Sequence, residues 1–246
     1  MTSLAAIKLG GSVITSKTEY RSFRSETTAS IVKALSEKFD SFALVIGGGS
    51  FGHFKSKEFG LPGKASKRTM EGAGIVHRDM SELAGLVHDS LMKRGLNAYS
   101  FSPGELMRDG IPDYAEPLRY LEAGMIPLLY GDVFASGGEF MIYSGDSIML
   151  DLCKTGRFDK AIFFSDVDGI FDRDPKRFKD AKLMKRLSGK VDFSTSSGDV
   201  TGGMRLKHSS MLEIAKHVKE VYLINGNYPE RIGDIGSEDF IGTVID

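Results

Sequence analysis

The 246-residue sequence is poor in cysteine and has no excess of charge of either sign. Its one cysteine, Cys153, excludes an intrachain disulfide and is typical of a reducing compartment. Because Cys153 falls in an apolar stretch, we expect a buried structural thiol rather than a nucleophile. The formal net charge of -1 provides no basic field, so we expect no nucleic-acid partner.

Long hydrophobic runs are also missing from the chain. No apolar stretch approaches the roughly 20 residues of a membrane-spanning helix. The N-terminal segment MTSLAAIKLGG lacks the long apolar region of a signal peptide. We therefore expect a cytoplasmic protein without a membrane partner. The hydrophobic content of 41% and the charged content of 26% are those of an ordinary globular chain.

Short apolar runs alternate with amphipathic helical patterns along the sequence. We predict strands at residues 5–9, 42–46, 98–101, 126–130, 140–143, 161–165 and 221–224. We predict helices at residues 25–39 (with Ser25 as the N-cap), 70–95, 117–123, 147–154 and 204–218. This alternation favours right-handed crossovers, and hence one continuous α/β domain whose mostly parallel sheet is covered on both faces.

Glycine clusters follow the first two predicted strands, where ligands gather in such sheets. Residues 8–12 are KLGGS and residues 47–53 are GGGSFGH. Glycines allow backbone N–H groups to turn inward around an anion, although either cluster alone could simply form a tight turn. Two such loops, one with a lysine, favour a phosphate ligand. Neither matches GxxxxGK[ST] or GxGxxG, so a P-loop enzyme and a dinucleotide dehydrogenase are disfavoured.

Two later segments add charged groups. The segment FFSDVDGIFDRDP, residues 163–175, turns at Asp168-Gly169 and has more acidic residues than a hairpin turn needs. They could hold a ribose, an adenine edge or a hydrated magnesium ion. The segment DVTGGMRLK, residues 199–207, opens a predicted helix at a glycine pair. Lys207 would then oppose the helix dipole in the first turn unless an anion lies there.

The ordered set KLGGS, VIGGGSFGH, YGDV, SGD, FFSDVDGIFDRDP and TGGMRLK resembles the amino acid kinase family. The resemblance spans nearly the whole chain. It implies an open αβα sandwich with a mostly parallel central sheet, ATP with Mg²⁺, and a homodimer. The part up to about residue 145 would bind the acceptor, and the part from about 146 to 246 the nucleotide. The position of a histidine directly after GGGSFG resembles the pattern of one branch of this family, the branch whose acceptor is isopentenyl phosphate.

The resemblance also implies catalytic roles for charged residues. Lys8 would touch the transferring group, Lys17 would stabilise the transition state, and Lys207 would lie on the β- and γ-phosphates. Asp146 would orient the lysines; its structural alternative is a helix N-cap, and both roles are compatible. Mg²⁺ would bridge the phosphates with much of its water retained, and we assign it no protein ligand.

Binding residues carried over from the resemblance cluster in the glycine motifs. His53 would add a donor to the Gly48 and Gly49 amides around the acceptor phosphate, although a loop histidine taken alone is usually a surface residue. The expected acceptor site is Gly10, Gly11, Gly48, Gly49, His53 and Gly145. The expected ATP site is Lys8, Gly10, Ser12, Gly49, Ser165, Asp166, Gly169, Phe171, Asp172, Lys176, Gly202, Gly203 and Lys207.

The hydrocarbon end of such an acceptor needs an apolar pocket. The candidates, each also compatible with ordinary core, are Ile75, Val76, Met80, Leu83, Val133 and Ile142. We expect His77 and His88 on a helix surface, and no histidine–cysteine cluster indicates zinc.

Two alternative functions stay open at this point. One is another small-molecule kinase of the same fold, fosfomycin-like or uridylate-specific. The other is a nucleotide-binding sensor or storage protein that has lost catalysis. The joint presence of Lys8, Lys17, Lys207 and Asp146 argues against such a loss.

Overall fold

An eight-stranded sheet forms the centre of the computed structural model, which describes residues 4–173, 177–187 and 210–246. The strand order is β11-β13-β12-β10-β1-β2-β7-β4. These strands are β1 (Ala5–Leu9), β2 (Phe42–Ile46), β4 (Ala98–Phe101), β7 (Ile126–Tyr130), β10 (Lys160–Ser165), β11 (Arg186–Leu187), β12 (Glu220–Asn225) and β13 (Thr243–Ile245). Adjacent strands are parallel except β12 and β13, which confirms the mostly parallel sheet.

Helices and smaller hairpins connect these strands. The helices are α1 (Gly11–Ile14), α2 (Ser25–Lys38), α3 (Gly49–Phe59), α4 (Lys67–Lys93), α5 (Pro103–Leu106), α6 (Ala115–Glu122), α7 (Gly145–Lys154) and the 3₁₀ helix η1 (Pro229–Asp234). Two small sheets contain β3 (Gly63–Lys64), β8 (Asp132–Ser136) and β9 (Glu139–Tyr143), and β5 (Met107–Arg108) and β6 (Ile111–Pro112). Residues 210–214 are also helical.

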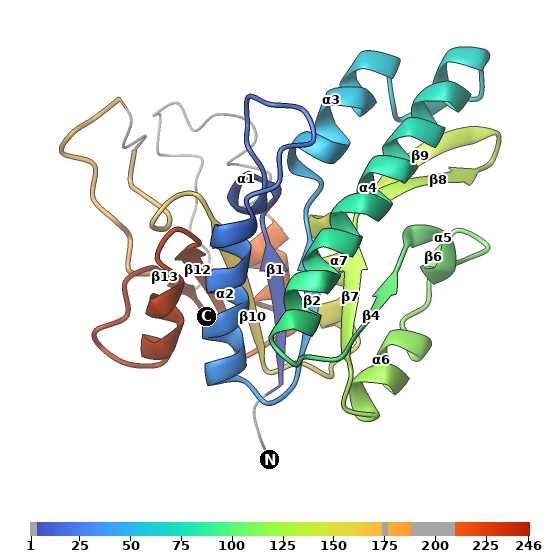
Figure 1. The fold of residues 1–246 in the computed structure, drawn as a ribbon. Coiled ribbons are helices and arrows are strands. Elements are labelled where there is room, and N and C mark those ends of the chain that lie inside the picture. Colours follow the sequence, from blue (N-terminus) through green and yellow to red (C-terminus); the bar gives the residue numbers. More distant parts are fainter. Residues whose placement is uncertain (1–3, 174–176, 188–209) are drawn as a thin grey trace.

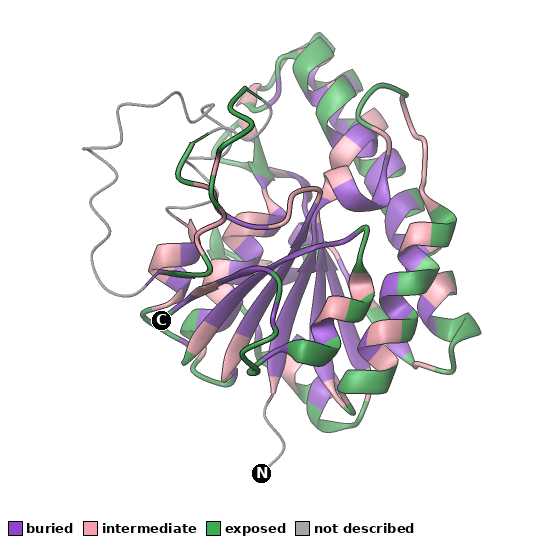
Figure 2. Ribbon diagram, turned by 90° about the vertical axis from the view of Figure 1, so that its left-hand side faces the viewer, coloured by how far each residue is buried: buried purple, intermediate pink, exposed green. Residues whose placement is uncertain are grey.

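The sheet divides the apolar core into two layers, because successive side chains of a strand point to opposite faces. On β1, Ile7 belongs to one buried cluster with Ile31 of α2 and Val87 of α4. Its neighbour Ala6 belongs to a second cluster, which includes Leu152 of α7. Buried strands accordingly lie between helices in Figure 2. The expected αβα sandwich is confirmed.

The carboxyl ends of the central strands define one edge of the molecule. In Figure 1, β1 runs upward from the N-terminal side, and α1 and α3 lie at its upper end. Helices α2 and α4 cover the front of the sheet in this view, while the β8–β9 hairpin projects beside the upper part of α4. Segments far apart in the sequence therefore meet at this edge.

Four predicted strands, β1, β2, β4 and β7, match the structure to the residue. The glycine pair Gly137-Gly138 turns the β8–β9 hairpin as expected, with φ of 58° and 79°. The predicted 70–95 helix begins three residues earlier, at Lys67, and Gly95 follows its end with φ of 80°. The 204–218 prediction is confirmed only at residues 210–214, which end in turns; residues 204–209 lie outside the described part.

The prediction that Ser25 caps α2 is wrong by one position. Arg24 is the N-cap, and Ser25 is the first helical residue. The Arg24 N–H donates to the carbonyl of Ile14 at 2.8 Å, and this bond fixes the chain where the helix begins. The Thr28 hydroxyl donates to the Arg24 carbonyl at 3.0 Å.

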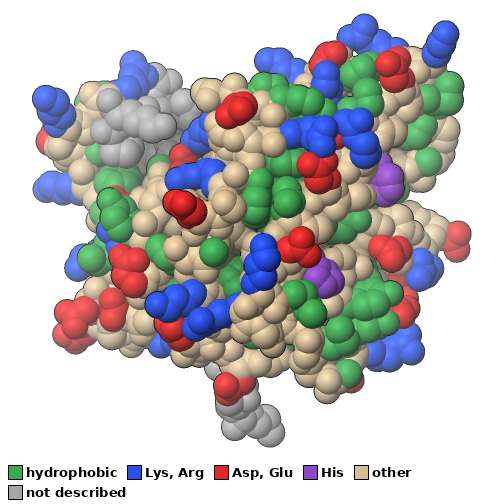
Figure 3. All heavy atoms as spheres, in the orientation of Figure 1, with side chains coloured by type: hydrophobic (Ala, Val, Ile, Leu, Met, Phe, Trp, Pro, Cys, Tyr) green, Lys and Arg blue, Asp and Glu red, His purple; other side chains and the backbone are tan. Residues whose placement is uncertain are grey.

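Basic and acidic side chains are interspersed on the face that carries α2 and α4 (Figure 3).

Among the described residues, no helix combines the length and apolar character that a membrane span requires.

Candidate active site

A cleft of about 470 Å³ lies where β1 and β2 end. It is lined by residues of the KLGGS and GGGSFGH motifs, the start of α7, α4 and the β8–β9 hairpin. These residues include Lys8, Gly10, Gly11, Ser12, Thr15, Lys17, Gly47, Gly48, Gly49, Ser50, His53, Val76, Met80, Asp132, Ile142, Gly145, Asp146 and Asp166. The structure thus brings the whole expected acceptor set to one cavity.

The two glycine loops touch each other in this cleft. A Cβ atom at Gly11 would lie 2.2 Å from the Gly49 nitrogen. A Cβ atom at Gly49, whose φ is 48°, would lie 2.1 Å from the Thr15 hydroxyl oxygen. Any larger residue at these two positions would force the loops apart. Close packing of backbone against backbone is therefore a second reason for glycine here, besides access for a ligand.

Thr15 stabilises the contact between the two glycine loops. The sequence analysis did not predict this role. Its buried hydroxyl donates to the Gly11 carbonyl at 2.7 Å and accepts from the Ser50 N–H at 3.0 Å. The side chain thus joins the loop after β1 to the first turn of α3. A threonine outside every quoted motif gives no sequence signal for such a role.

His53 lies on a helix rather than in a loop, so the expectation of a loop histidine is wrong. Helix α3 begins at Gly49, directly after the glycine run, and His53 is its fifth residue. The imidazole is exposed and lines the cleft with Gly48 and Gly49. Because the first-turn N–H groups of a helix point along its axis toward its N-terminus, this end of α3 favours an anion.

Lys8 and Asp146 form an ion pair inside the cleft. Lys8, on β1, is only 5% exposed, and its Nζ lies 2.8 Å from Oδ1 of Asp146. Asp146 is not the N-cap of α7: that position is Ser144, whose hydroxyl accepts from the Ser147 N–H at 3.1 Å. The N-cap alternative for Asp146 is therefore wrong, and its carboxylate is directed at the lysine.

Asp166 links the loop after β10 to the loop after β1. It accepts a hydrogen bond from the Ser12 hydroxyl at 2.8 Å and pairs with the ammonium group of Lys17. Partial burial alone would raise the pKa of Asp166, but these donors outweigh burial and lower it. The residue is thus a carboxylate at neutral pH, and it holds the predicted catalytic lysine at the cleft.

Two other acidic residues after β10, Asp168 and Asp172, accept hydrogen bonds from within the protein. Asp168 accepts from Arg231 at 2.5 Å and from Asn225 at 3.0 Å. Partial burial opposes the ionised form of Asp168, but these two donors outweigh burial and lower its pKa. Asp172 accepts from the Lys182 N–H at 2.8 Å. These carboxylates stabilise turns of the scaffold.

The remaining expected nucleotide residues are only partly described. Ser165 is the buried last residue of β10, and the Ile170 N–H after Gly169 donates to the Thr243 hydroxyl at 2.8 Å. Phe171 pairs with Leu183 in an isolated antiparallel bridge. None of the residues 165, 169, 171 and 172 lines the cleft described above. Lys176, Gly202, Gly203 and Lys207 lie outside the described residues and stay predictions.

One wall of the cleft is apolar. Val76 and Met80 of α4 and Ile142 of β9 line it, as the sequence analysis expected. Val76 and Met80 also belong to the buried core cluster, as do Leu83 and Val133, which do not line the cleft; Ile75 is half-buried outside the cleft lining.

Asp132 is a second cleft residue that the sequence analysis missed, although it lies within the quoted YGDV motif. It is 3% exposed, accepts from the Val133 N–H at 2.7 Å and lies 2.6 Å from Nδ1 of His77. Burial raises its pKa, although both hydrogen bonds oppose that shift. His77 is on the helix surface as expected, and half-buried His88 lies 3.1 Å from the Ser100 hydroxyl.

The expectation of a structural cysteine is confirmed. Cys153 is fully buried in α7, and burial raises the pKa of its thiol to about 12. In the described ranges, no cluster of three or more histidine, cysteine or acidic side chains could hold a metal ion.

Comparisons with known proteins agree with this geometry. The model of the amino acid kinase family matches residues 3–225. The chain is 48% identical to isopentenyl phosphate kinase of Thermoplasma acidophilum, over 97% of this chain and 98% of the relative. It is 29% identical to isopentenyl phosphate kinase of Methanothermobacter thermautotrophicus, over 92% of each chain. A crystal structure of the Thermoplasma enzyme in a product complex superposes with a TM-score of 0.89 at 45% identity, covering 99% of this chain and 100% of that one. The chain belongs to the amino acid kinase family.

Proposed function

We propose that the protein transfers the γ-phosphoryl group of ATP to isopentenyl phosphate, producing ADP and isopentenyl diphosphate. An oxygen of the acceptor phosphate forms a bond to the γ-phosphorus, in line with the breaking bond to the β–γ bridging oxygen. The observation that carries the proposal is the cleft itself: two glycine loops, two lysines, a histidine and an apolar wall line one cavity. The similarity to isopentenyl phosphate kinases over nearly the whole chain supports it.

The acceptor phosphate is proposed to lie against the start of α3. Backbone N–H groups at Gly48 and Gly49 and the imidazole of His53 would donate to its oxygens, with Gly10, Gly11 and Gly145 completing the floor. A phosphate monoester has more oxygens and more charge than a carboxylate, so the extra imidazole donor favours the phosphate. Because this acceptor is already an oxyanion, the reaction needs no general base.

The main obstacle to transfer is repulsion between two anions. Lys8 and Lys17 line the cleft and supply positive charge there, while Asp146 and Asp166 hold the two ammonium groups. We propose that Lys8 contacts the transferring group and that Lys17 stabilises its charge in the transition state. Fixed charges that neutralise a developing charge are often the largest contribution to such a reaction.

The nucleotide is proposed to lie along the ends of β1 and β10, next to Ser12 and Asp166. The predicted residues from Ser165 to Lys207 would complete its site in the C-terminal part of the chain, from about residue 146, and the preceding part would hold the acceptor. Mg²⁺ would enter with ATP and neutralise charge on its phosphates, keeping several water ligands. This mode suits the donor set, since the carboxylates that line the cleft already pair with Lys8, Lys17 and His77.

The apolar wall favours a short hydrocarbon acceptor over a nucleotide acceptor. Val76, Met80 and Ile142 offer an isopentenyl group contact without a polar partner. A pyrimidine would instead need donors and acceptors that read its edge. We further propose a cytoplasmic homodimer, which is supported by the low cysteine content and by the family resemblance.

Release of ADP with a panel of acceptors tests the proposal. The panel contains isopentenyl phosphate, isopentenol, uridine monophosphate, fosfomycin and glutamate, each with ATP and Mg²⁺. We expect isopentenyl phosphate to give the largest kcat/KM and the free alcohol far less. Equal or greater turnover with the alcohol, the nucleotide, fosfomycin or the carboxylate would contradict the assignment.

A further inference from the structure

The segment that carries Lys17 is a tightly closed hairpin-like loop, residues 15–24, which we call the Lys17 loop. At its base, Thr15 and Phe23 form an antiparallel bridge, and the Ser16 N–H donates to the Ser22 carbonyl at 2.9 Å. Near its tip, Arg21 has a left-handed φ of 55°, which is unfavourable for a residue with a side chain. Such a conformation persists only where surrounding contacts hold it.

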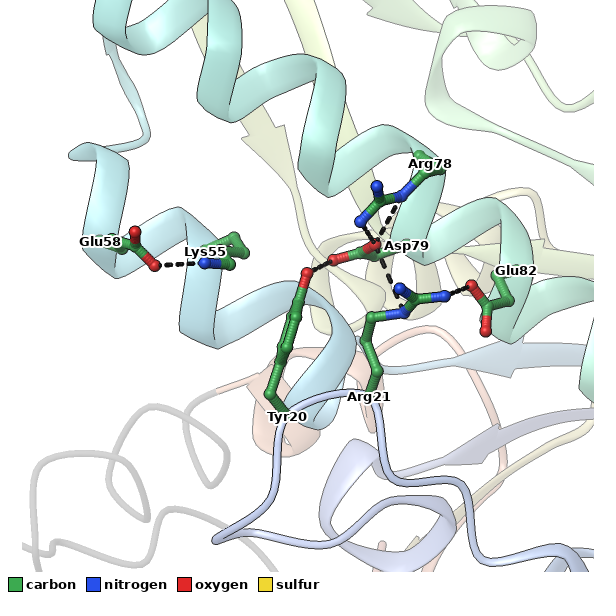
Figure 4. Close-up of polar contacts among 7 residues, drawn as sticks. All are labelled: Tyr20, Arg21, Lys55, Glu58, Arg78, Asp79 and Glu82. Carbon is green, nitrogen blue, oxygen red and sulfur yellow. Dashed lines mark hydrogen bonds and ion pairs between the residues drawn. The ribbon is translucent and has the colours of Figure 1, made fainter.

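The contacts that hold the tip converge on a buried carboxylate of α4, Asp79 (Figure 4). Asp79 is 0% exposed. The Tyr20 hydroxyl donates to its Oδ2, and Arg21 Nε lies 3.6 Å from its Oδ1. On α4 itself, Arg78 donates to Oδ1 at 2.6 Å and 3.0 Å. Two of the three partners of this buried charge therefore come from the Lys17 loop.

Tyr20 also contacts the helix that carries His53. Its ring centroid lies 6.2 Å from that of Phe54, and Lys55 Nζ lies 5.1 Å from the centre of the Tyr20 ring. Arg21 pairs in addition with Glu82, one turn after Asp79 on α4. On the other side of the loop, Lys17 pairs with Asp166 after β10. The loop is thus fixed at α3 and α4 on one side and at the end of β10 on the other.

We propose that Asp79 is a positioning residue for phosphoryl transfer: through Tyr20 and Arg21 it holds the Lys17 loop in the conformation that keeps Lys17 at the cleft. The inference rests on the proposed function, because it concerns the lysine assigned to the transition state. A buried carboxylate that loses its donors is strongly destabilised, so the loop and α4 dock as one unit. A small displacement of a catalytic charge is sufficient to slow a reaction considerably.

The test is a double-mutant cycle in kcat between Tyr20→Phe and Lys17→Ala in the full chain. Tyr20→Phe keeps the ring and removes the donor to Asp79. We expect it to lower kcat roughly tenfold, with the KM for isopentenyl phosphate changed by less than about twofold. In the Lys17→Ala background, the same substitution should change kcat by less than about twofold, because the group that it positions is gone. Equal losses in both backgrounds, or an unchanged kcat in Tyr20→Phe, would overturn the proposal.

Tyr222→Phe is the matched control. Like the half-buried Tyr20, the buried Tyr222 donates to a carboxylate, that of Glu220 at 2.8 Å, but it lies on β12 and is not part of the Lys17 loop. The kcat of the Tyr222→Phe protein should equal that of the unsubstituted protein. Asp79→Asn should lower kcat more than Tyr20→Phe does, when both proteins are assayed below their melting temperatures. A folded Asp79→Asn protein with normal kcat would contradict the positioning role.

Amide hydrogen exchange of residues 16–22 tests the anchoring without any substrate. We expect faster exchange in Tyr20→Phe than in the unsubstituted protein, with no change in Tyr222→Phe. Unchanged exchange would refute the anchoring. If the unsubstituted protein did not phosphorylate isopentenyl phosphate, the proposed function would fail, while faster exchange would still support the anchoring.

Discussion

Strands β1 and β10 are neighbours and end at the same edge of the sheet, but the polar residues that follow them do not all face the same cavity. After β1, Ser12 and Lys17 both line the cleft. After β10, Asp166 lines the cleft, whereas Asp168, two residues later, binds Arg231 and Asn225. A place at the carboxyl end of a strand is therefore insufficient to identify a site residue. The partners of each side chain decide whether it serves the ligand or the scaffold.

The largest expected effect concerns the β1 side. Lys17→Ala should lower kcat about a hundredfold or more, with a much smaller change in acceptor KM, because charge develops in the transition state. Steady-state kinetics with isopentenyl phosphate and ATP measure both constants. A near-normal kcat would place Lys17 with the scaffold residues and remove the contrast between the two strand ends.

His53 is expected to give the next largest effect. His53→Ala should lower kcat/KM for isopentenyl phosphate roughly tenfold to a hundredfold, since a hydrogen bond to a charged group contributes about 1.5–3 kcal/mol. His53→Gln should retain more activity, because its amide can still donate. The side chain is exposed on α3, so both variants should melt close to the unsubstituted protein. Wild-type kcat/KM in the Ala variant would make a carboxylate acceptor the better hypothesis.

Asp166 and Asp168 form a matched pair that sharpens the comparison. Asp166→Asn removes the charge that pairs with Lys17 and should lower kcat about tenfold. Asp168→Asn should leave kcat and KM within about twofold, because its partners belong to the scaffold. Kinetics of the two variants in parallel check this. Equal losses in both would mean that the whole acidic segment serves the nucleotide.

The smallest expected effect is on stability at Asp168. Its ion pair with Arg231 is partly exposed, so Asp168→Asn should lower the melting temperature by only about 2–4 °C. Because folding lowers the pKa of Asp168, the carboxylate contributes stability above the ordinary carboxyl pKa of about 3.9. That contribution is lost as pH falls through the lowered value. Thermal melts from neutral pH to about pH 3 should show the difference in melting temperature between the two proteins become smaller as pH falls below about 3.9.

The sequence was sufficient for the sheet and for much of the cleft. Strands β2 and β7 are continuous apolar runs, and β1 departs from this pattern only at Lys8, because both faces of the sheet are covered; such runs have clear ends. The convergence of Lys8 and Gly49 follows from the parallel pairing of β1 with β2, since parallel strands end at one edge, whereas Asp146 follows β9 of a separate small sheet.

Pairings between distant segments could not be predicted in the same way. Asp79 has the sequence context of any helix residue, yet it is fully buried because Tyr20, 59 positions earlier, folds over it. Asp132 and Thr15 likewise contact residues distant in the sequence, His77 and Ser50. The glycine run suggested a long loop before His53, whereas Gly49 already begins helix α3. Composition alone does not separate Asp166 from Asp168; the family resemblance did so, because it placed only Asp166 in the expected ATP site.

The central claim, that this cleft joins two phosphates, is tested most directly by ³¹P NMR of the complete reaction. The unsubstituted protein is mixed with ATP, Mg²⁺ and isopentenyl phosphate. We predict that the monophosphate signal disappears as two coupled signals of a diphosphate ester grow, in equal amount to the ADP formed. Loss of the γ-phosphorus of ATP as inorganic phosphate alone, with the isopentenyl phosphate signal unchanged, would contradict the account.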